Sequence, residues 1–393
     1  MTLLVCLAVS LAICAQKKEL NEAEGYLKSG KNLEKAEKLM TDLLKKPEHR
    51  DNKKVYLMWY RSVVAQYEAG NEKLYLHQKY DTAQFFNLVQ RMYTVAEALD
   101  SIDARPDRKG RVRPDFRRRH AEQLDAVRRN LYAGGTWQLN RQNYDDAYSF
   151  FNTYLDTDRQ PLFKGYGYLV NDSLMPQAAF WATQCGFLLQ RPDSVLAHHQ
   201  QALLDTPHRT FTLQYVCEAY RWQQCDSLYV TTLCQGVNEY PEHPYFFPRL
   251  ADWFTAHAMP DSVLQLSDRV LHINPDNLLA LLAKSVAQLN TSDDDGCIAT
   301  SRRLIALNDT LPEPYYNIAT VRLNQALSLE IENEPRKNRS RLQELYREAR
   351  PYMERYRQLA PDHRQRWAPA LYRIYFNLNM GREFEEIDRI LNQ

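Results

Sequence analysis

Few residues in this 393-residue chain have the types and spacing that catalysis or metal binding requires. Asp293, Asp295 and Gly296 imitate part of a calcium-binding loop. Such a loop needs an oxygen ligand at its first position and a bidentate glutamate at its twelfth, but these positions hold Thr291 and Arg302. We therefore interpret the segment as a turn that connects two helices.

Two adjacent histidines, His198 and His199, are the other candidate for a metal site. Neighbouring side chains on a helix point in different directions, so the two rings do not readily bind one ion. The motifs HExxH, GxGxxG, the Walker loop and GxSxG are absent from the sequence. We therefore expect no catalytic residue, no metal and no cofactor, and we do not expect an enzyme.

A short basic segment is marked as a loop by Pro106, Gly110 and Pro114. Its basic residues are Arg105, Arg108, Lys109, Arg111 and Arg113. Clustered arginines suit phosphates or acidic lipid headgroups, because a guanidinium binds two oxygens at once. One hypothesis is therefore a peripheral contact with a membrane or another anion. The alternative is a solvated insertion, which the scarcity of aromatic residues beyond Phe116 favours.

The overall charge gives no further support to an anionic partner. Lys and Arg number 50 and Asp and Glu number 49, which leaves a net charge of +1. A chain with so small a net charge has no long-range field that attracts nucleic acid. We therefore expect no nucleic-acid partner.

The elements that position any binding residues follow from an internal repeat. Pro207, Pro241 and Pro275 are spaced 34 residues apart. A second series with the same spacing consists of Val195, Tyr229, Val263 and Cys297. Two series in one register predict a repeated structural unit of 34 residues.

The segment 131–155 is the best single copy of this unit. Its Gly134-Gly135 pair suits the crowded contact positions of a first helix, and Tyr144 opens the second helix. By this motif and by its period the chain resembles the tetratricopeptide repeat (TPR) family, in particular the exported envelope TPR proteins of Gram-negative bacteria. The resemblance implies an all-α fold, a right-handed α-solenoid of about nine antiparallel helix pairs.

The repeat also divides the chain into segments. We expect a signal peptide (1–15), N-terminal TPR-like repeats (16–100), a basic insertion (101–116), one TPR repeat (117–160), an irregular connection (161–175), four contiguous 34-residue repeats (176–311), and C-terminal repeats (312–393) with an insertion at 330–340.

The expected signal peptide rests on an apolar run without charges, Leu3 to Ala15. The run is too short to cross a bilayer, which takes about 20 residues, and cleavage after Ala15 fits an export signal. A buried first helix is the alternative. The run also resembles a lipid-attachment motif ending at Cys14, although Ile13 stands where a small residue belongs. We expect an exported protein in the periplasm or at the outer membrane.

Removal of that signal would leave five of the seven cysteines. An odd number argues against a complete disulfide framework, and Cys217 and Cys297 fall on repeat positions where small residues let helices approach. A disulfide between Cys217 and either Cys225 or Cys234 stays open as an alternative.

In the TPR family the first helices of the repeats line a concave groove, and fixed positions on them reach the ligand. Carried onto this chain, those positions give Tyr132, Phe180, Phe187, Phe211, Glu218, Arg221, Trp222, Tyr245, Tyr316, Tyr372 and Tyr375. This set is aromatic and lightly charged, unlike the Lys- and Arg-lined clamps of chaperone-binding members.

The resemblance therefore implies a scaffold for protein–protein interactions in the cell envelope that binds a partner peptide or helix in an aromatic groove. A soluble protein that binds carbohydrate or lipid in the same groove is the alternative function. For each single aromatic residue, packing between repeats is the alternative role. The sequence leaves the oligomeric state open.

Overall fold

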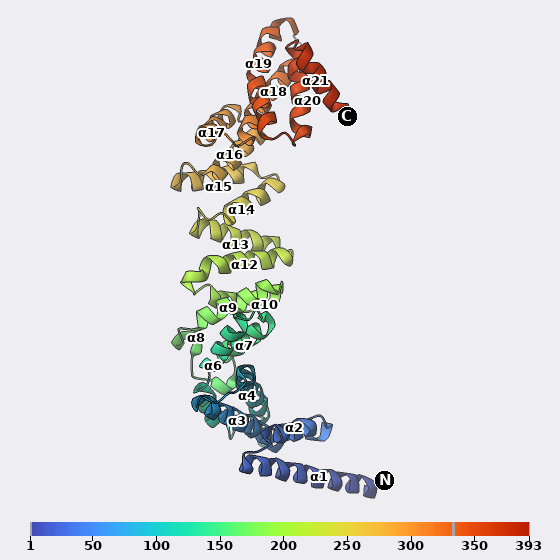
Figure 1. The fold of residues 1–393 in the computed structure, drawn as a ribbon, viewed down its shortest axis with the longest axis vertical. Coiled ribbons are helices and arrows are strands. Elements are labelled where there is room, and N and C mark those ends of the chain that lie inside the picture. The colour runs from blue at the N-terminus through green and yellow to red at the C-terminus, as the bar shows by residue number, and fades with distance from the viewer. Residues whose placement is uncertain (1, 332–334, 393) are drawn as a thin grey trace. The chain divides into compact units, whose positions relative to one another are not determined.

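The computed structural model describes residues 2–331 and 335–392, with side chains described for 16–331 and 338–392. These residues form 21 α-helices and no strand, which confirms the predicted all-α solenoid class. The chain divides into two compact units, Met1–Cys225 and Asp226–Gln393. Within each unit the helices follow one another side by side in chain order (Figure 1).

The first unit contains twelve of the α-helices. They are α1 (Thr2–Ser29), α2 (Leu33–Leu44), α3 (Lys53–Tyr75), α4 (Thr82–Asp103), α5 (Arg117–Asp125), α6 (Arg129–Leu139), α7 (Tyr144–Asp156), α8 (Tyr168–Asn171), α9 (Met175–Leu188), α10 (Pro192–Leu196), α11 (His199–Ala202) and α12 (Arg209–Trp222). Consecutive helices pack as pairs: α1 with α2, α3 with α4, α6 with α7, and α9 with α10 and α11.

The second unit contains the remaining nine. They are α13 (Asp226–Glu239), α14 (Phe246–Ala256), α15 (Pro260–Ile273), α16 (Leu278–Asn290), α17 (Asp294–Leu307), α18 (Glu313–Ile331), α19 (Pro335–Leu359), α20 (Arg364–Asn377) and α21 (Gly381–Leu391). From α14 onward they also pack as consecutive pairs.

The 34-residue period is visible in the backbone. The helices α10, α13, α15 and α17 begin at residues 192, 226, 260 and 294. Two residues before each start, the chain adopts the left-handed conformation at Gln190, Gln224, Ala258 and Ser292. The same turn chemistry therefore recurs in each repeat, although none of these four residues is glycine.

Hydrogen bonds explain why this turn ends the first helix of each pair. At the end of α9, the Gln190 amide donates to the Phe187 carbonyl at 2.9 Å and the Arg191 amide donates to the Gly186 carbonyl at 2.9 Å. This is the Schellman motif, which satisfies the last carbonyls of a helix and reverses the chain. The next helix can then pack back against the one just ended.

Close helix packing also confirms the role predicted for the two glycines of α6. A Cβ atom on Gly134 would lie 2.9 Å from Phe150, and one on Gly135 would lie 2.7 Å from Phe151. Real Cβ atoms do not approach so closely, so only glycine lets α6 meet α7 at this distance.

Part of the expected insertion at 330–340, residues 332–334, lies outside the described residues. Its described part lengthens the two neighbouring helices, because α18 continues to Ile331 and α19 begins at Pro335. These helices have 19 and 25 residues, against 13 and 14 in α16 and α17. Proline at the first position of α19 costs no hydrogen bond there.

Residues 2–15 of the expected signal peptide lie in α1, and their side chains are outside the description. Among the described helices, none combines the length and the apolar character that crossing a bilayer demands. No disulfide joins two cysteines among the described side chains, so the bridge left open at Cys217 does not form in this structure.

Candidate functional site

Aromatic side chains recur along one face of α12. Phe211, Tyr215 and Trp222 are four and seven residues apart, which places them on the same side of a helix. On α9, Phe180 and Phe187 are likewise two turns apart. The helices α9 and α12 lie next to each other in the first unit (Figure 1). Their two rows of rings meet, as the contacts of Phe187 with Tyr215 and Trp222 show.

Tyr215 is the centre of this meeting. Its ring centroid lies 4.4 Å from that of Phe187, at 25° between planes, and 6.4 Å and 6.5 Å from those of Phe180 and Phe211. Phe187 in turn stacks on Trp222 at 5.5 Å and 17°. Four predicted groove residues are therefore brought together, three of them directly around Tyr215, which was not predicted.

His208 and Trp181 extend the cluster at its other end. His208 stacks on Phe180 at 4.1 Å and 11°, and its centroid is 5.5 Å from that of Trp181. Its Nδ1 lies 2.8 Å from Asp205 Oδ2, which orients the ring. The α9–α12 aromatic cluster consists of Phe180, Trp181, Phe187, His208, Phe211, Tyr215 and Trp222.

Exposure differs across the α9–α12 aromatic cluster. Phe180 is 2% exposed and forms its base, whereas Phe211 is 50% exposed. Phe187, Tyr215 and Trp222 are half-buried. Large rings that are partly exposed in one row can still bury apolar area against a ligand.

The polar groups of this face are few. Burial raises the pKa of Tyr215, so its hydroxyl remains a neutral hydrogen-bond donor. Glu218 lies on the same helix, and its Oε2 is 2.6 Å from Arg221 Nη2. The two predicted charged residues therefore form an ion pair with each other, and the face offers mainly aromatic surface.

Tyr132, predicted in the same groove, packs on α7 through its ring and reaches α9 through its hydroxyl. Its hydroxyl donates to Gln177 Oε1 at 2.6 Å, and its ring packs edge-on against Phe151 at 5.7 Å. Tyr132 therefore ties α6 to α9 and α7.

The remaining predicted residues belong to the second unit: Tyr245 contacts its own helix α14, and the others contact neighbouring helices. Tyr245 lies under the Arg249 guanidinium at 3.8 Å, Tyr316 lies 5.0 Å from Tyr356, and Tyr372 lies 4.6 Å from Phe384. Tyr375 is only 4% exposed, and its hydroxyl donates to Glu354 at 3.1 Å. Because α19 and α21 flank α20, little of the Tyr375 side chain is exposed.

The basic segment is partly neutralised by its own carboxylates. Arg105 pairs with Asp51 at 2.8 Å, and Arg111 pairs with Asp107 at 2.8 Å. The other three predicted residues are exposed, and no ion pair joins them to a described residue: Arg108, Lys109 and Arg113. Two of the five predicted anion contacts are therefore already occupied.

The segments excluded as metal sites have structural roles. Asp293 accepts a hydrogen bond from the Gly296 amide at 3.1 Å and so caps α17, which confirms the predicted turn. His198 Nε2 lies 2.8 Å from Asn152 Oδ1, and His199 Nδ1 lies 2.6 Å from the Leu196 carbonyl oxygen. Among the described side chains, no group of three His, Cys, Asp or Glu could hold a metal ion.

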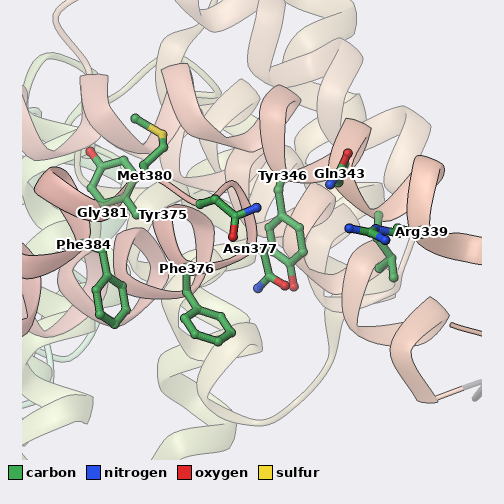
Figure 2. Close-up of a pocket in the computed structure, with 11 residues that line it drawn as sticks. Arg339, Gln343, Tyr346, Tyr375, Phe376, Asn377, Met380, Gly381 and Phe384 are labelled. Carbon is green, nitrogen blue, oxygen red and sulfur yellow. The ribbon is translucent and has the colours of Figure 1, made fainter.

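A separate pocket of about 600 Å³ lies in the second unit (Figure 2). It is lined by Arg339, Leu342, Gln343, Tyr346, Tyr375, Phe376, Asn377, Asn379, Met380, Gly381 and Phe384. These residues come from α19, the end of α20, the turn that follows it and the start of α21. Tyr375 among them is a predicted site residue.

Comparisons with known proteins find matches only among solved structures. No protein-family model matches the chain, and no curated protein matches it. Among solved structures, the C-terminal part of a TPR repeat-containing protein from Cytophaga hutchinsonii is 11% identical, covering 64% of this chain and 91% of that one, with a TM-score of 0.43. Yeast Tom70 is 14% identical, covering 93% and 89%, with a TM-score of 0.36. The TPR protein YrrB is 12% identical, covering 47% and 87%, with a TM-score of 0.34.

Proposed function

Because this chain has a TPR-type fold, we propose that it is a scaffold for protein–protein interactions and that its α9–α12 aromatic cluster binds a peptide or helix of a partner. The observation that carries this proposal is a row of stacked rings on two adjacent first helices, in which Phe187 and Phe211 stack on Tyr215 and Trp222 stacks on Phe187. Rigid aromatic rings in one row are typical anchors of protein interfaces.

The chemistry of the cluster favours a partner segment with apolar side chains. Glu218 and Arg221, the two predicted charged residues on the same helix, pair with each other, which weakens the field that a strongly charged ligand would meet there. An amphipathic helix or an extended apolar peptide would bury the exposed ring of Phe211 and the half-exposed ring of Trp222.

The proposal also places the protein in the bacterial envelope, as an exported protein of the periplasm or outer membrane. Its support is the uncharged apolar run from Leu3 to Ala15. Fractionation of cells that express the full-length chain tests this part separately. A protein found in the cytosol at its full length would contradict export but would leave the proposed binding site unaffected.

Crosslinking followed by a pull-down from intact cells tests the scaffold role. We expect stoichiometric protein partners with the wild type, and Phe211→Ala or Trp222→Ala should each weaken binding by about 2 kcal/mol if these rings are anchors. Tyr75→Ala is the matched control, because Tyr75 is an aromatic residue of the same unit that is 83% exposed and lies outside the cluster.

The same experiment separates the alternative function. Near-parallel exposed rings also stack on sugar rings or on acyl chains, and a cluster with no protein partner would move the assignment to carbohydrate or lipid binding. Recovery of the same protein partners by the wild type, Phe211→Ala and Trp222→Ala would refute the proposed site.

A further inference from the structure

The pocket in the second unit exists because the insertion makes α19 longer than a repeat helix. Arg339, Leu342, Gln343 and Tyr346 are three, four and seven residues apart and so lie on one face of α19. They belong to the first turns of this helix, which the 34-residue repeat does not contain. Figure 2 shows Arg339, Gln343 and Tyr346 across the pocket from Met380 and Gly381.

The turn that joins α20 to α21 forms the other wall. Asn379 adopts the left-handed conformation, and the Met380 amide donates to the Tyr375 carbonyl at 2.9 Å, which closes the end of α20. A Cβ atom on Gly381 would meet nothing within 4 Å. The start of α21 therefore leaves open space beside the backbone.

The inner end of the pocket is rigid and electrically balanced. Tyr346 is 1% exposed, its hydroxyl donates to Glu330 Oε1 at 2.6 Å, and it accepts from Arg373 Nε at 2.9 Å. Arg373 also donates to Glu330 Oε2 at 2.5 Å. These groups satisfy one another and leave no charge that requires a ligand.

The outer part of the described lining combines apolar surface with the cation of Arg339. Phe376 is 64% exposed, and its centroid lies 5.8 Å from that of Phe384. Leu342 and Met380 add aliphatic surface. Arg339 is exposed, and no ion pair joins it to another described residue.

We propose that this pocket binds a small carboxylic acid with an apolar body, independently of the α9–α12 aromatic cluster. The apolar body packs against Phe376, Phe384 and Leu342, and the carboxylate pairs with the guanidinium of Arg339. A volume of about 600 Å³ lies within the roughly 300–1,000 Å³ of small-molecule sites. One guanidinium matches one carboxylate through two parallel hydrogen bonds.

A carboxylate is preferred to a phosphate because, among the described residues that line the pocket, Arg339 is the single cation without a carboxylate partner. The neighbouring Arg341 is paired with Glu344 at 2.8 Å, and Arg373 is paired with Glu330. A dianion would therefore keep part of its charge uncompensated.

Isothermal titration of the full-length protein with 4-phenylbutyrate tests the proposal, with 4-phenylbutanol as the neutral ligand of the same shape. We expect the acid to bind at least tenfold more tightly than the alcohol, since a charge-assisted pair is lost in the alcohol. Arg339→Gln should weaken the acid about tenfold and leave the alcohol unchanged. Phe376→Ala should weaken both ligands.

Controls separate this site from its surroundings. Arg341→Gln, a change two residues away on the same helix, should leave binding of the acid unchanged, and so should Phe211→Ala in the first unit. Both tested side chains are exposed, so Arg339→Gln and Phe376→Ala should keep the wild-type circular dichroism and Tm.

Three results would overturn the proposal. They are equal binding of acid and alcohol, equal binding of the acid by wild type and Arg339→Gln, and binding of a peptide with a C-terminal phenylalanine while the free acid gives no heat. The last result would assign the pocket to a chain terminus.

Discussion

Arg128 should be among the most sensitive positions in the first unit. It is 4% exposed, and its guanidinium lies 3.8 Å from the ring centroids of both Tyr154 and Tyr168. It donates to Thr157 Oγ1 at 2.9 Å and pairs with Asp172. This one side chain therefore joins α7 to the irregular connection that leads into α9.

The magnitude follows from what the substitution Arg128→Met leaves behind. Burial works to raise the pKa of Asp172, but hydrogen bonds from Tyr154 and Arg128 hold it below its ordinary value. Without the guanidinium, the carboxylate stays in a largely buried place with its charge uncompensated. Removal of one partner of a buried pair costs about 3–5 kcal/mol.

Urea unfolding and amide hydrogen exchange of the full-length variant measure this cost. We expect the midpoint of the first unit's transition to fall, and the amides of residues 161–188 to lose protection first, because they depend on Asp172 for their position. Adding Asp172→Asn to Arg128→Met should recover part of the loss, since it removes the stranded charge. A loss below about 1 kcal/mol, or strictly additive effects of the two substitutions, would refute this account of the network.

Three further predictions concern the repeat and the pH dependence. Ala258→Gly should stabilise the second unit by about 1 kcal/mol in urea unfolding, because a left-handed alanine is strained, and destabilisation would contradict this. Gly135→Ala should lower stability by about 1–3 kcal/mol, since its Cβ would lie 2.7 Å from the buried ring of Phe151, and an unchanged Tm would argue against tight α6–α7 packing. Burial, and to a lesser extent the charge of Asp156, raise the pKa of Glu97 to about 7. Between about pH 4.5 and 7 the folded state therefore binds a proton that the unfolded state has lost. The free energy of unfolding should fall by about 1–3 kcal/mol as pH rises through this range. Glu97→Gln should flatten that part of the stability profile, and an unaltered profile would show that Glu97 titrates normally.

The repeat could be predicted from the sequence because each 34-residue unit folds by local rules. The starts of α13, α15 and α17 and the crowding at Gly135 follow from spacing and residue size. Phe187 and Trp222 were placed on the ligand face by the same register, and they do meet across α9 and α12.

Departures from the register were harder to foresee. Tyr215 occupies a position that the family pattern does not assign to the groove, although its spacing of four from Phe211 was a usable signal. The pocket depends on α19 beginning at Pro335. The charged residues around Pro335 instead predict an insertion between two helices. Tyr375 has the spacing of a groove residue, but its burial depends on how α19 and α21 pack on α20, which no local pattern contains.

Site-specific photocrosslinking tests the central claim most directly. A photoreactive p-benzoylphenylalanine replaces Phe211, which is half exposed on the α9–α12 aromatic cluster, or Tyr75 as the control. Irradiation of intact cells should join a partner protein to the chain labelled at residue 211, and much less to the chain labelled at residue 75. If residue 211 forms no protein adduct, or if both positions form the same adducts, the cluster is not the site that binds a partner.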